Sequence, residues 1–346
     1  KFKAFNTGLT FSEAVAGERT PHNQQVIDIS ANSDMKCACS SCNGVLQEGS
    51  RWVSASKKAV EYYLDPRNFL NERYIFQFED TTYSSSHNIS GIETIIKNTW
   101  MHNAYITYYD TSGNLVYYTK NGSKVTYSEA IMEAAKASGM SAYYLASKIV
   151  QEVGSSTSSY ATGTRGTASP YNGIYNYYSI GAYTGAYDGL SWANGYMKSN
   201  KECTLYKSNS TSSNALAIVP ASTTLYWKAN SGSFYKVGVS VGGSIVTGYV
   251  LSSAVSISTT YGRPWSNPYQ SIYYGAQWIS ERYSKQFTGY LQKFNVNSAS
   301  SDLFGHEYMT NVEGAASEAT SSYRAYSEAG LLSTEKIFSI PVFKNM

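Results

Sequence analysis

The stretch that most constrains this 346-residue chain is a capped amphipathic helix between Ser141 and Gly154 that ends in a single acid. Ser141 is suited to cap the first turn, and Gly154 stands where a left-handed residue would end the helix. The apolar residues recur at steps of three and four and form one stripe: Ala142, Leu145, Ala146, Ile149, Val150 and Val153. Glu152 therefore lies in the last turn, beside the stripe. There it is either a general acid in a partly desolvated site or a solvated glutamate at a helix end.

The segment after Glu152 is almost uncharged and rich in aromatic and amide side chains. Between Val153 and Tyr187 the only charged residue is Arg165. The aromatic and amide residues are Tyr160, Tyr171, Tyr175, Tyr177, Tyr178, Tyr183, Asn172 and Asn176. Flat faces with polar tips, together with amide groups, suit an uncharged hydroxyl-rich ligand such as a sugar. The alternative is a tyrosine-rich β-hairpin whose rings serve only its own packing.

Four motifs in order give the chain a family resemblance. They are SKIVQEVG with YNGIYNYYSIGAY, the segment Ala59 to Asp80, the segment Pro268 to Tyr283, and the segment Phe304 to Ala319. Together they resemble glycoside hydrolase family 73, the bacterial endo-β-N-acetylglucosaminidases that cut peptidoglycan, in its clostridial and bacillar members. The resemblance spans most of the chain from about Ala59 to the end. It implies an α+β, lysozyme-like fold with a mainly helical lobe and a β-hairpin lobe, with Glu152 as catalytic acid and the tyrosine-rich hairpin lining the cleft.

Residues 201–258 differ in composition from the rest, because short β-rich runs alternate there with Ser, Asn and Gly turns. This pattern predicts a small all-β barrel. The strands around Leu205, Ser233 to Val237 and Thr247 to Val250 resemble those of a bacterial SH3 domain, with Tyr249 in place of the usual tryptophan. We therefore expect a polar N-terminal segment (1–50), a discontinuous glucosaminidase domain (51–200 and 259–346), and an inserted wall-binding module (201–258). The alternative is a β excursion of the catalytic domain without a binding role of its own.

Several local elements can also be expected. The Asp65-Pro66 step should end a helix near Leu64. Residues 90–99 and 127–138 should be helical. The alternating runs between Tyr105 and Tyr118, joined by a turn at Asp110, look locally like a hairpin, although this region tends to be helical in the family.

The acids that follow Glu152 constrain the mechanism. Most glycosidases use two carboxyl groups, roughly 5–5.5 Å apart when retaining and roughly 6.5–9.5 Å apart when inverting. The aromatic segment offers none, and the next acid is Asp188. Either Asp188 holds the attacking water or the substrate's own 2-acetamido group attacks the anomeric carbon, and we expect the second. The expected catalytic residues are Glu152, Tyr178 and Asp188, and the expected substrate-binding residues are Gln151, Tyr175, Asn176, Tyr177, Tyr308 and Asn311.

Composition fits an exported wall enzyme better than other classes. Charged residues make up 15% of the chain and the formal net charge is +3, which is too weak for a nucleic-acid surface. No apolar run approaches the roughly 20 residues that span a bilayer. Because the chain begins at Lys1 without a signal peptide, we expect a mature or trimmed form. The expected protein is a secreted, cell-wall-associated monomer that acts on peptidoglycan without a cofactor.

The four cysteines are the remaining puzzle: Cys37, Cys39 and Cys42 are clustered, and Cys203 is distant. A zinc site completed by Cys203 or His22 would need a more regular spacing, so we predict no metal. A disulfide, local or reaching Cys203, is favoured for an exported protein, and the pairing is open.

Rival functions share parts of this pattern. A lytic transglycosylase also uses one glutamate in a lysozyme-like fold, and a non-catalytic wall-binding protein would not need Glu152 at all. A cysteine peptidase is disfavoured because no Cys-His pattern accompanies the clustered cysteines. A serine hydrolase is disfavoured because the chain has no G-x-S-x-G elbow.

Overall fold

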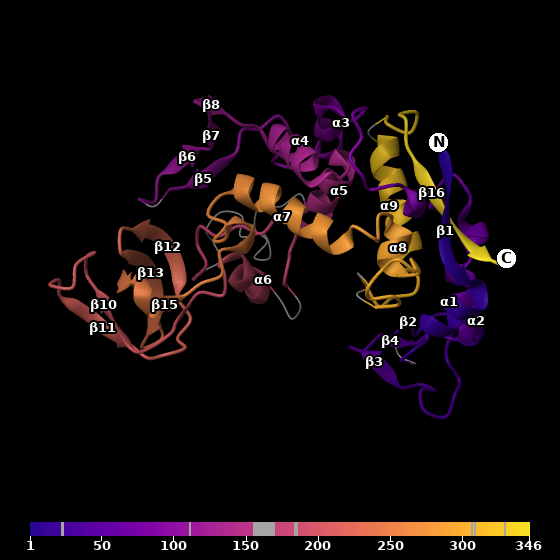
Figure 1. Ribbon diagram of the computed structural model, residues 1–346, viewed down its shortest axis with the longest axis horizontal. Coiled ribbons are helices and arrows are strands. Elements are labelled where there is room, and N and C mark those ends of the chain that lie inside the picture. The colour runs from indigo at the N-terminus through magenta and orange to yellow at the C-terminus, as the bar shows by residue number, and fades with distance from the viewer. Residues whose placement is uncertain are drawn as a thin grey trace. The chain divides into compact units, whose positions relative to one another are not determined.

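The structure is a computed structural model that describes residues 1–21, 24–110, 112–154, 170–182, 186–305, 307, 309–328 and 330–346 (Figure 1). It contains two compact units. Unit 1 consists of Lys1–Thr82 and Ser280–Met346, and unit 2 is the continuous stretch Tyr83–Ile279. The expected domain boundaries stay a prediction. Residues 1–50 belong to unit 1 and contribute Ala14, Val15 and Ile27 to its buried core.

The N-terminal and C-terminal strands of the chain pair with each other in unit 1. Strand β1 (Phe2–Thr10) pairs in parallel with β16 (Phe338–Lys344), and the two lie side by side in indigo and yellow in Figure 1. Helix α2 (Lys57–Leu64) ends just before Asp65-Pro66, which confirms the expected stop. The other elements are α1 (Phe11–Gly17), α8 (Gly289–Lys293), α9 (Gly314–Glu328) and a three-stranded sheet in the order β2 (Val26–Asp28), β4 (Trp52–Ser54), β3 (Leu46–Glu48).

The helical part of unit 2 contains α3 (Ile89–Ile95), α4 (Tyr127–Ser138) and α5 (Ala142–Val153), which contact one another. Helix α4 starts at a capping box and ends at Gly139, whose φ of 72° is left-handed. The structure confirms the expected helices 90–99 and 127–138, the first in a shorter form.

The hairpin expected from local alternation is present. Strands β5 (Thr107–Tyr109) and β6 (Leu115–Tyr117) pair antiparallel. The carboxylate of Asp110 accepts from the backbone N–H groups of Ser112 and Asn114 and so holds the turn. A small second ribbon follows, formed by β7 (Thr119–Lys120) and β8 (Ser123–Lys124).

In the tyrosine-rich segment, the described residues 170–182 contain turns and no strand, so the expected hairpin is not found there. Their rings are buried in unit 2, and hydrogen bonds between Asn176 and Ile180 hold the turns in place of a strand ladder. Later in the sequence come helix α6 (Ala186–Ala193) and, beyond the sheet of residues 201–258, helix α7 (Pro268–Tyr283). Asn267 accepts from the N–H of Gln270 and so caps α7, whose first residue is a proline.

Residues 201–258 contain a five-stranded antiparallel sheet in the order β11-β10-β14-β13-β12. Its strands are β10 (Cys203–Tyr206), β11 (Ala215–Val219), β12 (Tyr226–Ser231), β13 (Phe234–Val241) and β14 (Ser244–Leu251). Just outside them, β9 (Lys198–Ser199) pairs with β15 (Val255–Ser256) and brings the ends of the excursion together. The likeness of this sheet to an SH3 domain stays a prediction. Among the described helices of the whole chain, none combines the length and apolarity needed to cross a bilayer.

Candidate functional site

Glu152 lies in the last turn of α5 and is half-buried. The helix buries Leu145, Ala146 and Ile149 completely, as the stripe predicted. Its last turn ends at Gly154, whose N–H donates to the carbonyl of Val150. Because the helix ends here, the carboxyl of Glu152 stands at the point where α5 gives way to the tyrosine-rich segment.

Two polar neighbours on α5 accompany Glu152. The ammonium of Lys148, on a side chain that is almost fully buried, donates to Oε1 of Gln151 at 3.4 Å. It also lies 5.9 Å from the ring centroid of Tyr144. Gln151 itself is exposed. The end of α5 therefore brings together a half-buried carboxyl and an exposed amide, which can contact a polar substrate, and a buried cation that holds the amide.

The tyrosines predicted to line a cleft are instead buried. Tyr175, Tyr177 and Tyr178 are 3%, 1% and 7% exposed. The hydroxyl of Tyr177 donates to that of Tyr127 on α4 at 3.2 Å. Its backbone N–H donates to Oγ of Ser271 on α7. Burial raises the pKa of all three phenols, so their hydroxyls stay protonated.

Tyr178 differs from its two neighbours. Its hydroxyl is buried and makes no hydrogen bond to any described residue. Its ring packs directly on Gly275 of α7, where an added Cβ would lie 2.5 Å from Cδ2 of the ring. Tyr175, in contrast, accepts a hydrogen bond from the backbone of Tyr109, which opposes the effect of burial on its pKa. Tyr178 is therefore the member of the group whose buried hydroxyl has no hydrogen-bond partner among the described residues.

Asn176 has a structural role in the described fold. Its side chain is fully buried, and its amide nitrogen donates to the carbonyls of Ile180 and Gly189 at 2.8 and 2.9 Å. Its Oδ1 accepts from the N–H of Ile180. Both amide protons are thus used within the protein, and they fix α6 against the tyrosine-rich segment. Sugar binding by Asn176 stays a prediction that this geometry does not favour.

The hydrogen bond from Asn176 to the carbonyl of Gly189 also positions the neighbouring Asp188. It lies in the first turn of α6, next to Gly189, and is half-buried. Its charge acts on Tyr171, whose pKa is raised mainly by burial and further by Asp188. The structure therefore holds Asp188 close to the tyrosine-rich segment that follows Glu152.

The remaining predicted site residues are Asn311 and Tyr308, and their part in the site stays a prediction. Asn311 belongs to unit 1, where its Oδ1 accepts from the N–H of Glu313 at 3.0 Å. Tyr308 lies outside the described residues, as does His306.

Unit 2 contains a cavity of about 520 Å³ that the sequence did not predict. It lies between the β5–β6 hairpin, the tyrosine-rich segment and the five-stranded sheet, and its lining includes Tyr109, Asn172, Trp227, Lys228 and Lys236. Glu152 is not part of this lining. Aromatic walls with a few polar groups are typical of ligand pockets. The tyrosine pairs of the hairpin were visible in the sequence, but nothing local signalled that β12 would face them.

Lys228 joins the sheet to the tyrosine-rich segment. Its ammonium donates to the carbonyls of Pro170 and Asn172, each at 3.0 Å. Burial lowers its pKa to about 8. The lysine thus anchors one wall of the cavity to another.

Comparison with known proteins gives a fold but not a close relative. No protein-family model and no curated protein matches the chain. Among solved structures, S. aureus glucosaminidase B aligns with a TM-score of 0.56 at 16% identity, over 100% of this chain and 94% of that one. A major bifunctional autolysin gives 0.52 at 15% over 99% of each chain, and S. aureus autolysin E gives 0.50 at 14% over 97% and 96%. The chain therefore has the mixed helix-and-sheet fold of these glucosaminidase and autolysin structures.

Proposed function

We propose that this protein is a glycoside hydrolase that cleaves the β-1,4 bond after N-acetylglucosamine in peptidoglycan, with Glu152 as the general acid. The single observation that supports this most is the fold likeness over the whole chain to glucosaminidase B and the major autolysin. The proposal gives the acid step to Glu152 because its half-buried carboxyl lies at the end of α5, beside the exposed amide of Gln151. The proposed protein is secreted, acts on cell walls and needs no cofactor.

The proposed reaction begins with proton transfer. Glu152 would protonate the oxygen of the scissile bond while the exposed amide of Gln151 binds the sugar. The acetamido oxygen of the substrate would attack the anomeric carbon, and water would then open the ring that forms. Tyr178 is our candidate to orient the acetamido group, because its hydroxyl has no other partner among the described residues.

Asp188 is the alternative to substrate assistance. Its place on α6, fixed by Asn176 through Gly189, keeps a second carboxyl near the tyrosine-rich segment. Asp188→Asn separates the two mechanisms. Near-normal turnover supports acetamido participation, whereas a loss comparable with that of Glu152→Gln makes Asp188 the second catalytic carboxyl.

The decisive test is Glu152→Gln in zymography on purified walls. We expect activity to fall at least about 10²-fold, the usual scale for loss of a general acid. The matched control is Glu202→Gln, which changes an exposed glutamate of the same unit and should leave activity unchanged. Thermal melts establish that both variants fold. Wild-type activity in a folded Glu152→Gln protein would refute the assignment.

Product analysis by mass spectrometry fixes the bond. A reducing N-acetylglucosamine end supports the proposal, and an anhydro-muramic end would identify a lytic transglycosylase instead. A chain that binds walls but releases no fragments would be a non-catalytic wall-binding protein. In either active case we propose that the sheet of residues 201–258 adds a wall-binding surface to unit 2. The test compares a variant that lacks residues 201–258 with the intact chain and measures how much of each protein pellets with purified walls.

A further inference from the structure

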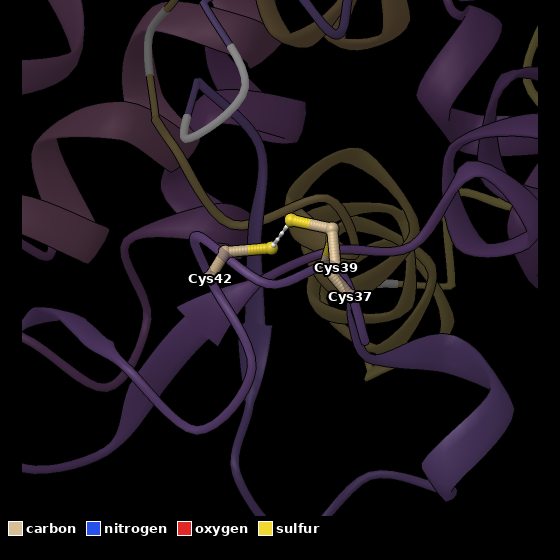
Figure 2. A group of neighbouring side chains, drawn as sticks. All are labelled: Cys37, Cys39 and Cys42. Carbon is tan, nitrogen blue, oxygen red and sulfur yellow. Dashed lines mark hydrogen bonds between the residues drawn. The ribbon is translucent and has the colours of Figure 1, made fainter.

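Three cysteine thiols converge in unit 1 (Figure 2). The Sγ atoms of Cys37, Cys39 and Cys42 all lie within 4.8 Å of one another. Those of Cys39 and Cys42 are 2.6 Å apart. Within the described residues, which include all four cysteines, each is a thiol rather than half of a disulfide.

The backbone holds this arrangement in place. The N–H of Cys37 donates to the carbonyl of Ser54 on β4 at 2.9 Å and so ties the first thiol to the sheet. The carbonyl of Cys39 accepts from the N–H groups of Cys42 and Asn43, which closes the Cys-x-x-Cys turn. Gly44 follows with a φ of 71°, a left-handed conformation that suits glycine. The folded backbone of this turn therefore brings the three thiols together.

We propose that Cys37, Cys39 and Cys42 form a binding site for one thiophilic metal ion, with Zn²⁺ as the expected occupant. Zn–S bonds of about 2.3 Å in tetrahedral geometry place sulfurs roughly 3.8 Å apart. The three sulfurs already lie within 4.8 Å of one another, and the Sγ atoms of Cys39 and Cys42, which are 2.6 Å apart, must separate when the ion binds. The fourth position would be taken by water or another small ligand. Because the group contains only thiols, it selects soft cations over Ca²⁺ and Mg²⁺, which require oxygen ligands.

A disulfide, which the sequence favours, would account for the short distance between Cys39 and Cys42 but not for the third sulfur beside them. It would join two of the sulfurs and leave the convergence of the third without a cause. The metal explains all three at once, including the two-residue and three-residue steps between them.

The electrostatics of the cluster agree with this site. Hydrogen bonding, first from Cys42 and then from Ser41, lowers the pKa of Cys39 to about 6. Burial, followed by hydrogen bonding with Cys37, raises the pKa of Cys42 to about 12. An arriving cation would form three metal–sulfur bonds and release the remaining thiol protons to solvent, with no change of oxidation state.

The test uses the full chain, reduced and freed of metal, and titrated with Co²⁺ as a spectroscopic probe. We expect one ion per chain, with sulfur-to-cobalt charge-transfer bands in the near ultraviolet and visible bands of tetrahedral Co²⁺ that Zn²⁺ abolishes. Cys37→Ser, Cys39→Ser and Cys42→Ser should each weaken binding by more than the roughly tenfold that loss of an outer-shell partner costs. Cys203→Ser, which changes the half-buried cysteine of β10 in unit 2, is the matched control and should bind as wild type.

A second measurement needs no variant. In the wild-type chain, Zn²⁺ should slow alkylation of Cys37, Cys39 and Cys42, mapped by peptide mass spectrometry, and leave that of Cys203 unchanged. Absence of the cobalt bands in the reduced wild-type chain, or equal binding by Cys42→Ser, would overturn the proposal. So would a Cys39–Cys42 disulfide whose reduction yields a chain that binds no Co²⁺. None of these readouts depends on hydrolysis, so the test of the metal site is independent of the proposed activity.

Discussion

The most demanding prediction concerns a buried charge network in unit 1. The ammonium of Lys293 donates to Oε2 of Glu307 at 2.9 Å, and the two side chains are 1% and 7% exposed. The amide of Gln25 donates to both Glu307 and Glu18, each at 2.9 Å. Burial, and then the nearby Glu307, raise the pKa of Glu18 well above its usual value, so Glu18 holds a proton. Lys293 is therefore the cation that balances the charge of Glu307.

Replacing this lysine should cost a large part of the stability. Lys293→Met keeps most of the aliphatic volume, so the loss of packing is small. It leaves a carboxyl buried without its cation, which costs about 3–5 kcal/mol when one partner of a buried pair is removed. Total stabilities of about 5–15 kcal/mol make this a severe change. At about 2–4 °C per kcal/mol, the melting temperature should fall by roughly 6–20 °C.

Urea denaturation and thermal melts measure the effect. Lys285→Met is the matched control, because Lys285 is exposed in the same unit, and it should change stability by less than about 0.5 kcal/mol. Adding Glu307→Gln to Lys293→Met should restore part of the loss, since the uncompensated carboxyl is then gone. A Lys293→Met protein within about 1 kcal/mol of wild type, with an unchanged denaturant slope, would refute this reasoning.

Three further changes test single contacts. Gly275→Ala places a Cβ against the ring of Tyr178, so unfolding in urea should become easier by about 1–3 kcal/mol; an unchanged midpoint would mean that the ring can move aside. Asn176→Ala leaves two buried carbonyls without their donor and should lower the free energy of unfolding by at least about 2 kcal/mol in the same assay. A loss below about 0.5 kcal/mol would exclude the structural role of Asn176. Burial raises the pKa of Glu79 to about 7, so the native state holds a proton there that the unfolded chain loses above its ordinary value of 4.5. Stability should therefore fall as pH rises from 4.5 to about 7, and Glu79→Gln should lessen that slope in melts across this range.

The parts of the fold that were predictable from the sequence are those set by neighbours in the chain. Helix α5 follows from the cap at Ser141, the apolar stripe and Gly154, and it forms as Ala142–Val153. The β5–β6 hairpin follows from alternation and from the local hydrogen bonds of Asp110. In this case the local signal was a better guide than the family's tendency toward helix.

What could not be predicted depends on partners far away in the chain. Nothing near Phe2 indicates that it pairs with Phe338, because parallel strands are joined through the whole intervening chain. The same holds for Tyr177, whose partners Tyr127 and Ser271 lie 50 and 94 residues away. A tyrosine has an apolar body and a polar tip, so its residue type alone does not say whether it faces a sugar or the core.

The burial of the tyrosine-rich segment changes what this segment can do for the proposed reaction. Through Tyr177 it is fixed to α4, which packs against α5, the helix that carries Glu152. Through its own backbone it is fixed to Lys228 of β12, and so to the sheet of residues 201–258. The bonds of Tyr177 to Tyr127 and Ser271 are buried and would be costly to leave unmade, so this part of the segment is a rigid support. Apart from Tyr178, the tyrosines thus serve the proposed site mainly by fixing the acid-bearing helix, α6 with Asp188, and the walls of the cavity within one unit. The other sugar contacts are left to exposed groups such as Gln151 and to the cavity lining.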